Sequence, residues 1–424
     1  MSLYWKCWTW CLILCAAHGF CRAQEYPVEW SERAVIERFL AQSPLARELR
    51  AQVAVTQAEA RVGAAYTNPS ISFSWEGAGY TAYYLQGSQA VPVSGRVGYL
   101  RQAVRAATAA ADTNREALLW SLRSDLRVAF LRMVAAQERA ALLAGRINDV
   151  ELLVQTLRQR EEAGEGSRYD RIRAERELAE LRADAAEAVS VVGAAGSRVA
   201  GFLPEGSRVQ RVVGSLGITS ELPDLELLVR RALSVRADYR AEKKNSARYR
   251  IEEQAARRLR VPEPVVSAGF ERAEAASGSG PNPFSNVTHN GLAFSVEVPL
   301  PLLNRGRYEV ARYQAEQEQA EARLAALARQ IRTEVEGARA VFDVRRDALA
   351  AYEREFREAG AELMRITQTA YQEGEIGILE LLDAYRVNNA SSLRQLDLEA
   401  GLKEAILDLE RAVGEELDGK EVQP

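Results

Sequence analysis

Few residues of this 424-residue chain have the type and spacing that enzyme chemistry requires. All four cysteines fall within the first 21 residues, and beyond that stretch His289 is the single histidine. Neither a histidine-based catalytic triad nor a histidine-rich metal site can be built from these residues. The sequence also lacks a nucleophile elbow, a Walker loop and a dinucleotide-binding fingerprint. We therefore expect a protein that is not an enzyme and that uses no cofactor or metal.

Carboxylates are abundant, but most are interleaved with arginine along predicted helices, which is typical of solvated helix faces. Glu380 and Asp383 have a different setting, because they directly follow two glycines, Gly374 and Gly377, that interrupt a helical pattern. Acidic residues in the first turn of a helix stabilise its positive end by about 0.3–1 kcal/mol, whatever the function. The position of these two carboxylates thus has a structural explanation beside any functional one.

Helical periodicity predicts the element that positions these carboxylates. Apolar residues recur at spacings of three and four in the segment Leu349, Tyr352, Phe356, Ala359, Leu363, Ile366 and Ala370, which indicates a helix packed along another helix. Glycine costs about 1 kcal/mol against alanine inside a helix and accepts positive φ at its end. A second amphipathic run begins at Leu379, so we predict a long antiparallel helical hairpin over residues 304–414 that turns at Gly374 to Gly377.

The same pattern occurs earlier in the chain. Gly164 and Gly166 interrupt a helical run, and a shift of 210 residues aligns Gly164 with Gly374 and Asp170 with Glu380. A unit of about 200 residues is therefore predicted to occur twice. The first repeat is predicted over 24–223, with N-terminal helices, a strand pair at 69–93 and a helical hairpin at 96–200. The second is predicted over 224–414, with helices at 224–260, a strand pair at 264–299 and a hairpin at 304–414, followed by a C-terminal tail at 415–424.

Strand-like segments precede each hairpin. Ile71, Phe73 and Trp75 alternate with serines, and a similar alternation includes Leu292 and Phe294, which predicts strands with one apolar face and one polar face. A small soluble sheet is one interpretation. Four strands cannot close a membrane barrel, so a pore would require several chains.

Residues 1–23 resemble an export signal, with Lys6 before an apolar stretch from Trp8 to Ala17 and a cleavage-like site ending at Ala23. A lipid-anchored cysteine is the alternative, although Leu14 and Phe20 are bulky for lipoprotein processing. No later segment offers 18 continuous apolar residues. The formal net charge of −4 gives no indication of nucleic-acid binding, which attracts clustered basic surfaces.

Four stretches together resemble the TolC-like outer membrane efflux proteins, with greatest similarity to the CzcC-type heavy-metal branch. They are residues 30–68, their echo at 224–264, the strand-to-helix junction Pro299-Leu-Pro-Leu-Leu-Asn304-Arg-Gly-Arg, and the segment Ala370 to Ala384. The resemblance extends from about residue 30 to residue 414 and occurs twice in the same order.

The resemblance implies a fold that is mainly α-helical with membrane β-structure. Long antiparallel hairpins would form an α-barrel, and a homotrimer would share one 12-stranded barrel, four strands from each chain, in outer-membrane lipid. The implied partners are a periplasmic adaptor (membrane fusion protein) and an inner-membrane pump of the RND or another type, with no nucleic acid. The implied function is passive conduction of metal cations or drugs to the exterior.

The resemblance also carries residue roles. Glu380 and Asp383 match acidic positions that ring the periplasmic mouth, where six carboxylates of three chains would favour cations. Tyr371 and Asp170 match partners in a hydrogen bond that holds the gate closed, although helix N-capping is an equal explanation for Asp170. The position of a second, arginine-based link holds Ile376, with Arg168 as a nearby substitute.

The resemblance further predicts that the hairpin tips, with Gly164, Gly166, Gly374 and Gly377, dock on the adaptor. Two alternatives stay open: an exported periplasmic coiled-coil scaffold without a pore and, less well supported, a hydrolase. Fractionation would separate a duct from a scaffold, because only the duct should be found in the outer membrane.

Overall fold

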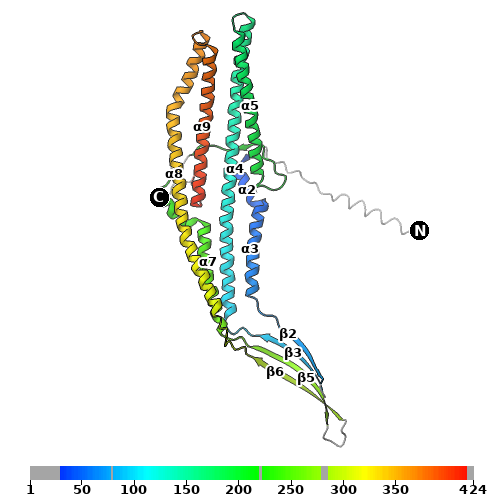
Figure 1. Cartoon of the computed structure of the whole chain (residues 1–424). Coiled ribbons are helices and arrows are strands. Elements are labelled where there is room, and N and C mark those ends of the chain that lie inside the picture. Colours follow the sequence, from blue (N-terminus) through cyan, green and yellow to red (C-terminus); the bar gives the residue numbers. More distant parts are fainter. Residues whose placement is uncertain (1–28, 78–79, 219–221, 278–284, 418–424) are drawn as a thin grey trace, which may run out of the picture.

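The computed structural model describes residues 29–77, 80–218, 222–277 and 285–417. The predicted export signal, the centre of the loop between the last two strands and the end of the C-terminal tail lie outside these described residues. The molecule is elongated, with paired helices reaching one end and a four-stranded sheet at the other (Figure 1).

The element order is helix, helix, strand, strand, long helix, shorter helix, and it occurs twice, which confirms the predicted internal duplication. The first copy consists of α2 (Glu32–Gln42), α3 (Pro44–Gly63), β2 (Ser70–Gly77), β3 (Tyr80–Ala90), α4 (Arg96–Glu162) and α5 (Arg168–Ala200). The second consists of α6 (Leu225–Val235), α7 (Ala237–Arg257), β5 (Val265–Ser277), β6 (Ser285–Glu297), α8 (Arg307–Gln372) and α9 (Ile378–Val413), with a short 3₁₀ turn η1 (Arg258–Arg260).

The long helices set the length of the molecule. The 67 residues of α4 and the 66 of α8 each extend about 100 Å at 1.5 Å per residue. Gly95 and Gly306 precede them with φ of 70° and 74°, a left-handed conformation that glycine adopts without a steric penalty. The chain therefore changes direction sharply between sheet and helix at both equivalent positions.

The sheet has the order β2-β3-β5-β6, and every neighbouring pair is antiparallel. Its register places Phe73, Leu85, Phe270 and Leu292 in one row across the four strands, and Ser70, Ser88, Ser267 and Ser295 in another. Because side chains alternate between faces along a strand, one face is apolar and the other hydroxylated. The apolar face is uncovered: 81% of Ile71 and 77% of Phe294 are exposed.

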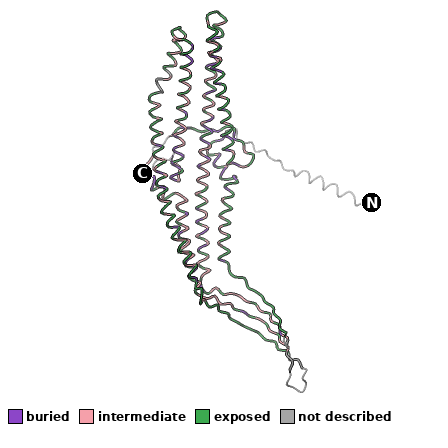
Figure 2. The backbone as a smooth tube through the Cα atoms, in the orientation of Figure 1, coloured by how far each residue is buried: buried purple, intermediate pink, exposed green. Residues whose placement is uncertain are grey.

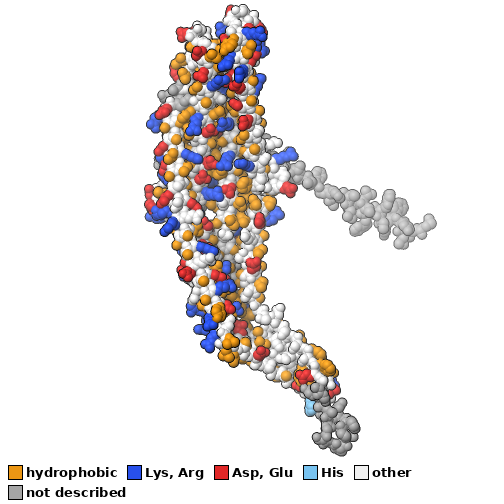
Figure 3. All heavy atoms as spheres, viewed as in Figure 1, with side chains coloured by type: hydrophobic (Ala, Val, Ile, Leu, Met, Phe, Trp, Pro, Cys, Tyr) orange, Lys and Arg blue, Asp and Glu red, His pale blue; other side chains and the backbone are white. Residues whose placement is uncertain are grey.

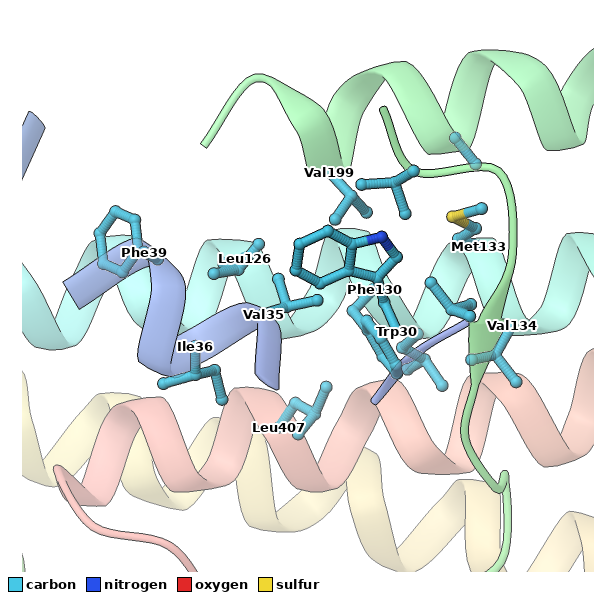
Figure 4. Close-up of a cluster of buried hydrophobic side chains, with 14 of the residues drawn as sticks. Trp30, Val35, Ile36, Phe39, Leu126, Phe130, Met133, Val134, Val199 and Leu407 are labelled. Atoms are coloured by element: carbon cyan, nitrogen blue, oxygen red, sulfur yellow. The ribbon is translucent and has the colours of Figure 1, made fainter. Parts of the chain in front are cut away.

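The buried residues follow the helix contacts rather than filling one globular centre (Figure 2). The largest cluster lies midway along the helices, where Trp30 and Phe39 pack against α4, α5 and α9 (Figure 4). A two-residue strand pair fixes this region, as β1 (Trp30–Ser31) runs parallel to β4 (Val212–Val213). Gln137 of α4 supports β4 by donating to the Val212 carbonyl and accepting from its N–H, at 2.8 and 2.9 Å. Leu396 and Leu407 of α9 belong to the same cluster, which thereby joins the two hairpins at mid-length.

Candidate functional site

The tips of the two helical hairpins lie at the end of the molecule opposite the sheet (Figure 1). Both tips have the same backbone geometry. Gly164 and Gly374 have φ of 76° and 77°. The next residue, Glu165 or Glu375, donates its N–H to the carbonyl oxygen five residues earlier, that of Arg160 or Ala370. These hydrogen bonds form a Schellman motif, which ends a helix at a residue in the left-handed conformation. The two glycines are thus required by the turns themselves.

The second glycine of each tip differs between the repeats. A Cβ added at Gly166 would lie 2.9 Å from backbone atoms of Arg160 and Glu161, so the tight turn excludes a side chain there. Gly377 is the N-cap residue of α9 and has an extended backbone. A Cβ at Gly377 would instead approach Oε2 of Glu380, at 3.0 Å. The tight turn therefore explains why residue 166 is a glycine. Adaptor docking at any of the four tip glycines stays a prediction.

The structure places Glu380 and Asp383 in the first two turns of α9, both exposed. The Glu380 carboxylate turns back toward Gly377 at the start of the helix, where the partial positive charge of the helix N-terminus favours an anion. Asp383 precedes Arg386 by three residues on α9. Hydrogen bonding to Glu177 is the main cause that raises the pKa of the Arg386 guanidinium, and the charge of Asp383 adds to it. The two carboxylates therefore lie on the exposed beginning of one helix, directly after the tip.

Tyr371 and Asp170 come close together across the two hairpins. Burial raises the pKa of the Tyr371 hydroxyl, and the negative charge of Asp170 raises it further, while Arg160 opposes both. Within the described residues no hydrogen bond joins Tyr371 to Asp170. The charge of Asp170 thus acts on the Tyr371 hydroxyl, and the closing hydrogen bond between them stays a prediction.

Helix capping does not explain Asp170. The N-cap of α5 is Ser167, whose Oγ accepts a hydrogen bond from the Tyr169 N–H at 3.1 Å. The capping interpretation of Asp170 was therefore wrong: this residue lies three positions later, in the first helical turn, and is half-buried. Arg168, predicted as a substitute in the gate, is exposed and forms no ion pair within the described residues.

An arginine-based link between the hairpins is present at a different position. Arg386 of α9 donates from Nε to both carboxylate oxygens of Glu177 of α5, at 2.9 and 2.8 Å, and from Nη2 to the same carboxylate. The Glu177 side chain is only 8% exposed, whereas that of Arg386 is 52% exposed. A fork of this kind fixes orientation as well as charge. Sequence reasoning missed it, because helical spacing alone does not show which residues of two separate hairpins face each other.

An apolar cluster supports this link. It joins α4, α5 and α9 just beyond the tips and consists of Val150, Val154, Leu157, Ala174, Leu178, Leu181, Ile378, Leu381 and Leu382. Tyr371 and Tyr385 pack against its side. Burial of these side chains stabilises the contact between the hairpins, and the Arg386–Glu177 pair fixes their relative position.

Two features are absent from the described part of the chain. No group of three His, Cys, Asp or Glu side chains there is arranged to hold a metal ion. Among the described helices, none has an apolar stretch long enough to span a membrane.

Comparisons with known proteins concern both the sequence and the fold. Residues 228–415 match the family model described as outer membrane efflux protein. No curated protein sequence matches the chain significantly.

Solved structures resemble nearly the whole chain. A membrane protein from Pseudomonas aeruginosa is 19% identical with a TM-score of 0.71, covering 90% of this chain and 93% of its own. CusC is 18% identical with a TM-score of 0.71, covering 91% and 92%. The open state of the MtrE outer membrane channel of Neisseria gonorrhoeae is 19% identical with a TM-score of 0.68, covering 91% and 89%. At these identities the structures establish a shared fold.

Proposed function

We propose that this chain, whose residues 228–415 match the outer membrane efflux protein family, forms the outer-membrane exit duct of a tripartite efflux system. The protein is located in the outer membrane, and its helices extend into the periplasm. Transport through this duct is passive, and the energy comes from the inner-membrane partner.

The observation that carries the proposal is the incomplete sheet. Its four strands expose an apolar face, and both outer strands, β2 and β6, have an unpaired edge. Unpaired edges and lipid-facing backbone are excluded from a bilayer unless a sheet closes on itself. Three copies would provide 12 strands and place the serine-rich face toward a common lumen. The assembly is therefore a homotrimer in which β2 of one copy pairs with β6 of the next.

The hairpin tips provide the periplasmic entrance of this duct. In a trimer the exposed Glu380 and Asp383 of three chains surround the axis and favour cations by charge. Tyr371, Asp170 and the Arg386–Glu177 pair hold the two hairpins of each chain together and keep the entrance narrow. The adaptor docks on the tips at Gly164, Gly166, Gly374 and Gly377, and an inner-membrane pump supplies both energy and cargo, which is either metal cations or drugs.

A pair of substitutions on adjacent residues tests the duct. Phe294→Asp places a charge on the apolar face of β6, whereas Ser295→Asp places the same charge on the hydroxylated face. A lipid-facing Arg or Lys costs about 2–4 kcal/mol at the bilayer midplane and an Asp costs less, but each of the three copies would carry the added charge. We expect Phe294→Asp to abolish the SDS-resistant, heat-dissociable trimer in outer-membrane fractions and Ser295→Asp to retain it. A soluble monomer for the unmodified chain would support the periplasmic scaffold instead.

A further inference from the structure

Basic side chains gather where the sheet meets the helices (Figure 3). We name four exposed arginines of this region the junction belt: Arg258, Arg260, Arg305 and Arg307. They belong to two segments in close contact, because a Cβ added at Gly306 would lie 2.7 Å from Cβ of Leu259 and 2.9 Å from the Ala256 carbonyl oxygen. The four positive charges are thus brought to one place by the packing of η1 against the start of α8.

Two carboxylates close to the belt in the sequence are engaged with other residues, whereas Glu309, in the first turn of α8, has one carboxylate oxygen without a hydrogen-bond partner. Glu253 accepts hydrogen bonds from Arg257 and Gln314, at 2.7 and 2.9 Å, and Glu263 accepts one from Ser94. Within the described residues no carboxylate forms an ion pair with a belt arginine. The belt therefore keeps its positive charge available for an anion.

Tyrosines stack against arginines at the same level of the molecule. The guanidinium carbons lie 4.7 to 5.4 Å from the ring centroids in the pairs Arg101–Tyr66, Arg258–Tyr99 and Arg307–Tyr308. Each tyrosine lies within a few residues of a boundary between sheet and helix. Rings with a polar tip are typical of the zone between hydrocarbon and water in membrane proteins.

An apolar stripe leads directly to the belt. It continues the outward face of β6 at every second position and consists of the exposed residues Leu292, Phe294, Val296, Val298, Leu300 and Leu302. Leu303 follows with 94% of its side chain exposed, and Arg305 and Arg307 come next. Along this segment the exposed side chains change from apolar to cationic within a few residues.

We propose that the junction belt binds the phosphate-bearing headgroups of anionic phospholipids in the periplasmic leaflet of the outer membrane. The proposal rests on the outer-membrane location and on the sheet facing lipid. Arginine binds phosphate oxygens through a planar fork of N–H donors, and the leucines beside it contact the acyl chains of the same lipids. Basic residues next to a membrane-spanning element attract anionic lipid through charge. The bound headgroups thereby set the depth at which the sheet lies in the bilayer.

Native mass spectrometry of the detergent-purified assembly tests the proposal with added phosphatidylglycerol as the anionic probe and phosphatidylcholine as the neutral one. Replacing all four belt arginines with glutamine should reduce phosphatidylglycerol retention at least tenfold and leave phosphatidylcholine retention unchanged. Arginine-to-lysine replacements at the same positions, which keep charge but not the fork, should retain part of the binding.

The control carries four glutamines at exposed arginines on the helices, away from the junction: Arg47, Arg198, Arg323 and Arg329. It should bind phosphatidylglycerol as the unmodified protein does. Equal retention by both glutamine variants would overturn the proposal. If the belt variant loses the trimer but retains the lipid, the belt arginines form contacts between copies instead. If inorganic phosphate displaces all of the phosphatidylglycerol, the belt is a simple anion site and the proposal fails.

Discussion

The ion pair between Arg386 and Glu177 gives the sharpest test of how the two hairpins of one chain are held together. Replacing Arg386 with glutamine removes a fork of hydrogen bonds and leaves the Glu177 carboxylate, 8% exposed, without its charged partner. Removing one partner of a fully buried pair costs about 3–5 kcal/mol, but half of the Arg386 side chain is in water, where the interaction is weaker. We therefore expect about 1–2 kcal/mol less stabilisation of the closed arrangement.

This free energy corresponds to a change of about 5- to 30-fold in the equilibrium between closed and open tips. Single-channel recordings in planar bilayers should show a higher open probability for Arg386→Gln. Arg168→Gln serves as the control, because Arg168 lies at the same end of the molecule and forms no ion pair within the described residues.

Charge reversal separates the pair from a general loss of structure. Arg386→Glu and Glu177→Arg should each open the tips, and the double variant should restore the closed state, since the opposite charges again face each other. Open probabilities that simply add in the double variant would refute the reasoning. An Arg386→Gln channel indistinguishable from the Arg168→Gln control would do the same.

Three further predictions concern the same helices. Alanine at both Glu380 and Asp383 should reduce cation selectivity, read as a reversal potential closer to zero under a salt gradient, whereas unchanged potentials would remove the acidic ring from the mechanism. Tyr371→Phe should raise conductance or antibiotic uptake if its hydroxyl bonds to Asp170, and equal conductance would leave Tyr371 as a packing residue of the apolar cluster. The pKa of Glu138 is raised, mainly by burial and then by the charge of Glu399. A carboxyl group whose pKa is raised in the folded state contributes stability at low pH, and this stability is lost as the pH rises through that pKa. Glu138→Gln should therefore flatten the decrease in thermal stability between acid and neutral pH, and an unchanged pH profile would contradict this assignment.

Much of the fold could be predicted from the sequence, because the signals were local and occurred twice. Spacings of three and four residues up to Ala370 marked α8, and glycine chemistry at Gly164 and Gly374 located both turns, where the structure has matching Schellman motifs. The alternation around Phe73 similarly identified a strand with one apolar face. Each of these patterns depends on residues that are close together in one segment, so it can be recognised in the sequence alone.

The candidate site was less predictable, because it depends on contacts between hairpins. Asp170 fitted an N-cap by composition, yet Ser167 occupies that position, since the helix begins three residues earlier than the capping interpretation required. The resemblance placed Ile376 at the arginine position and offered Arg168 of the other hairpin as a substitute, whereas Arg386 makes the contact from α9. The pairing of Arg386 with Glu177 follows from how two hairpins pack, which no spacing within either hairpin reveals.

The unequal edges of the sheet have a consequence for genetics. β2 and β6 are different sequences of 8 and 13 residues, so in the proposed trimer the contacts between copies would be head-to-tail and would have to close into a ring. A copy with one damaged edge strand can still pair through its other edge strand. It therefore joins an assembling ring and then prevents that ring from closing. Co-expression of equal amounts of damaged and intact chains would then leave about one-eighth of three-membered rings free of damage. An edge mutation should accordingly be dominant negative.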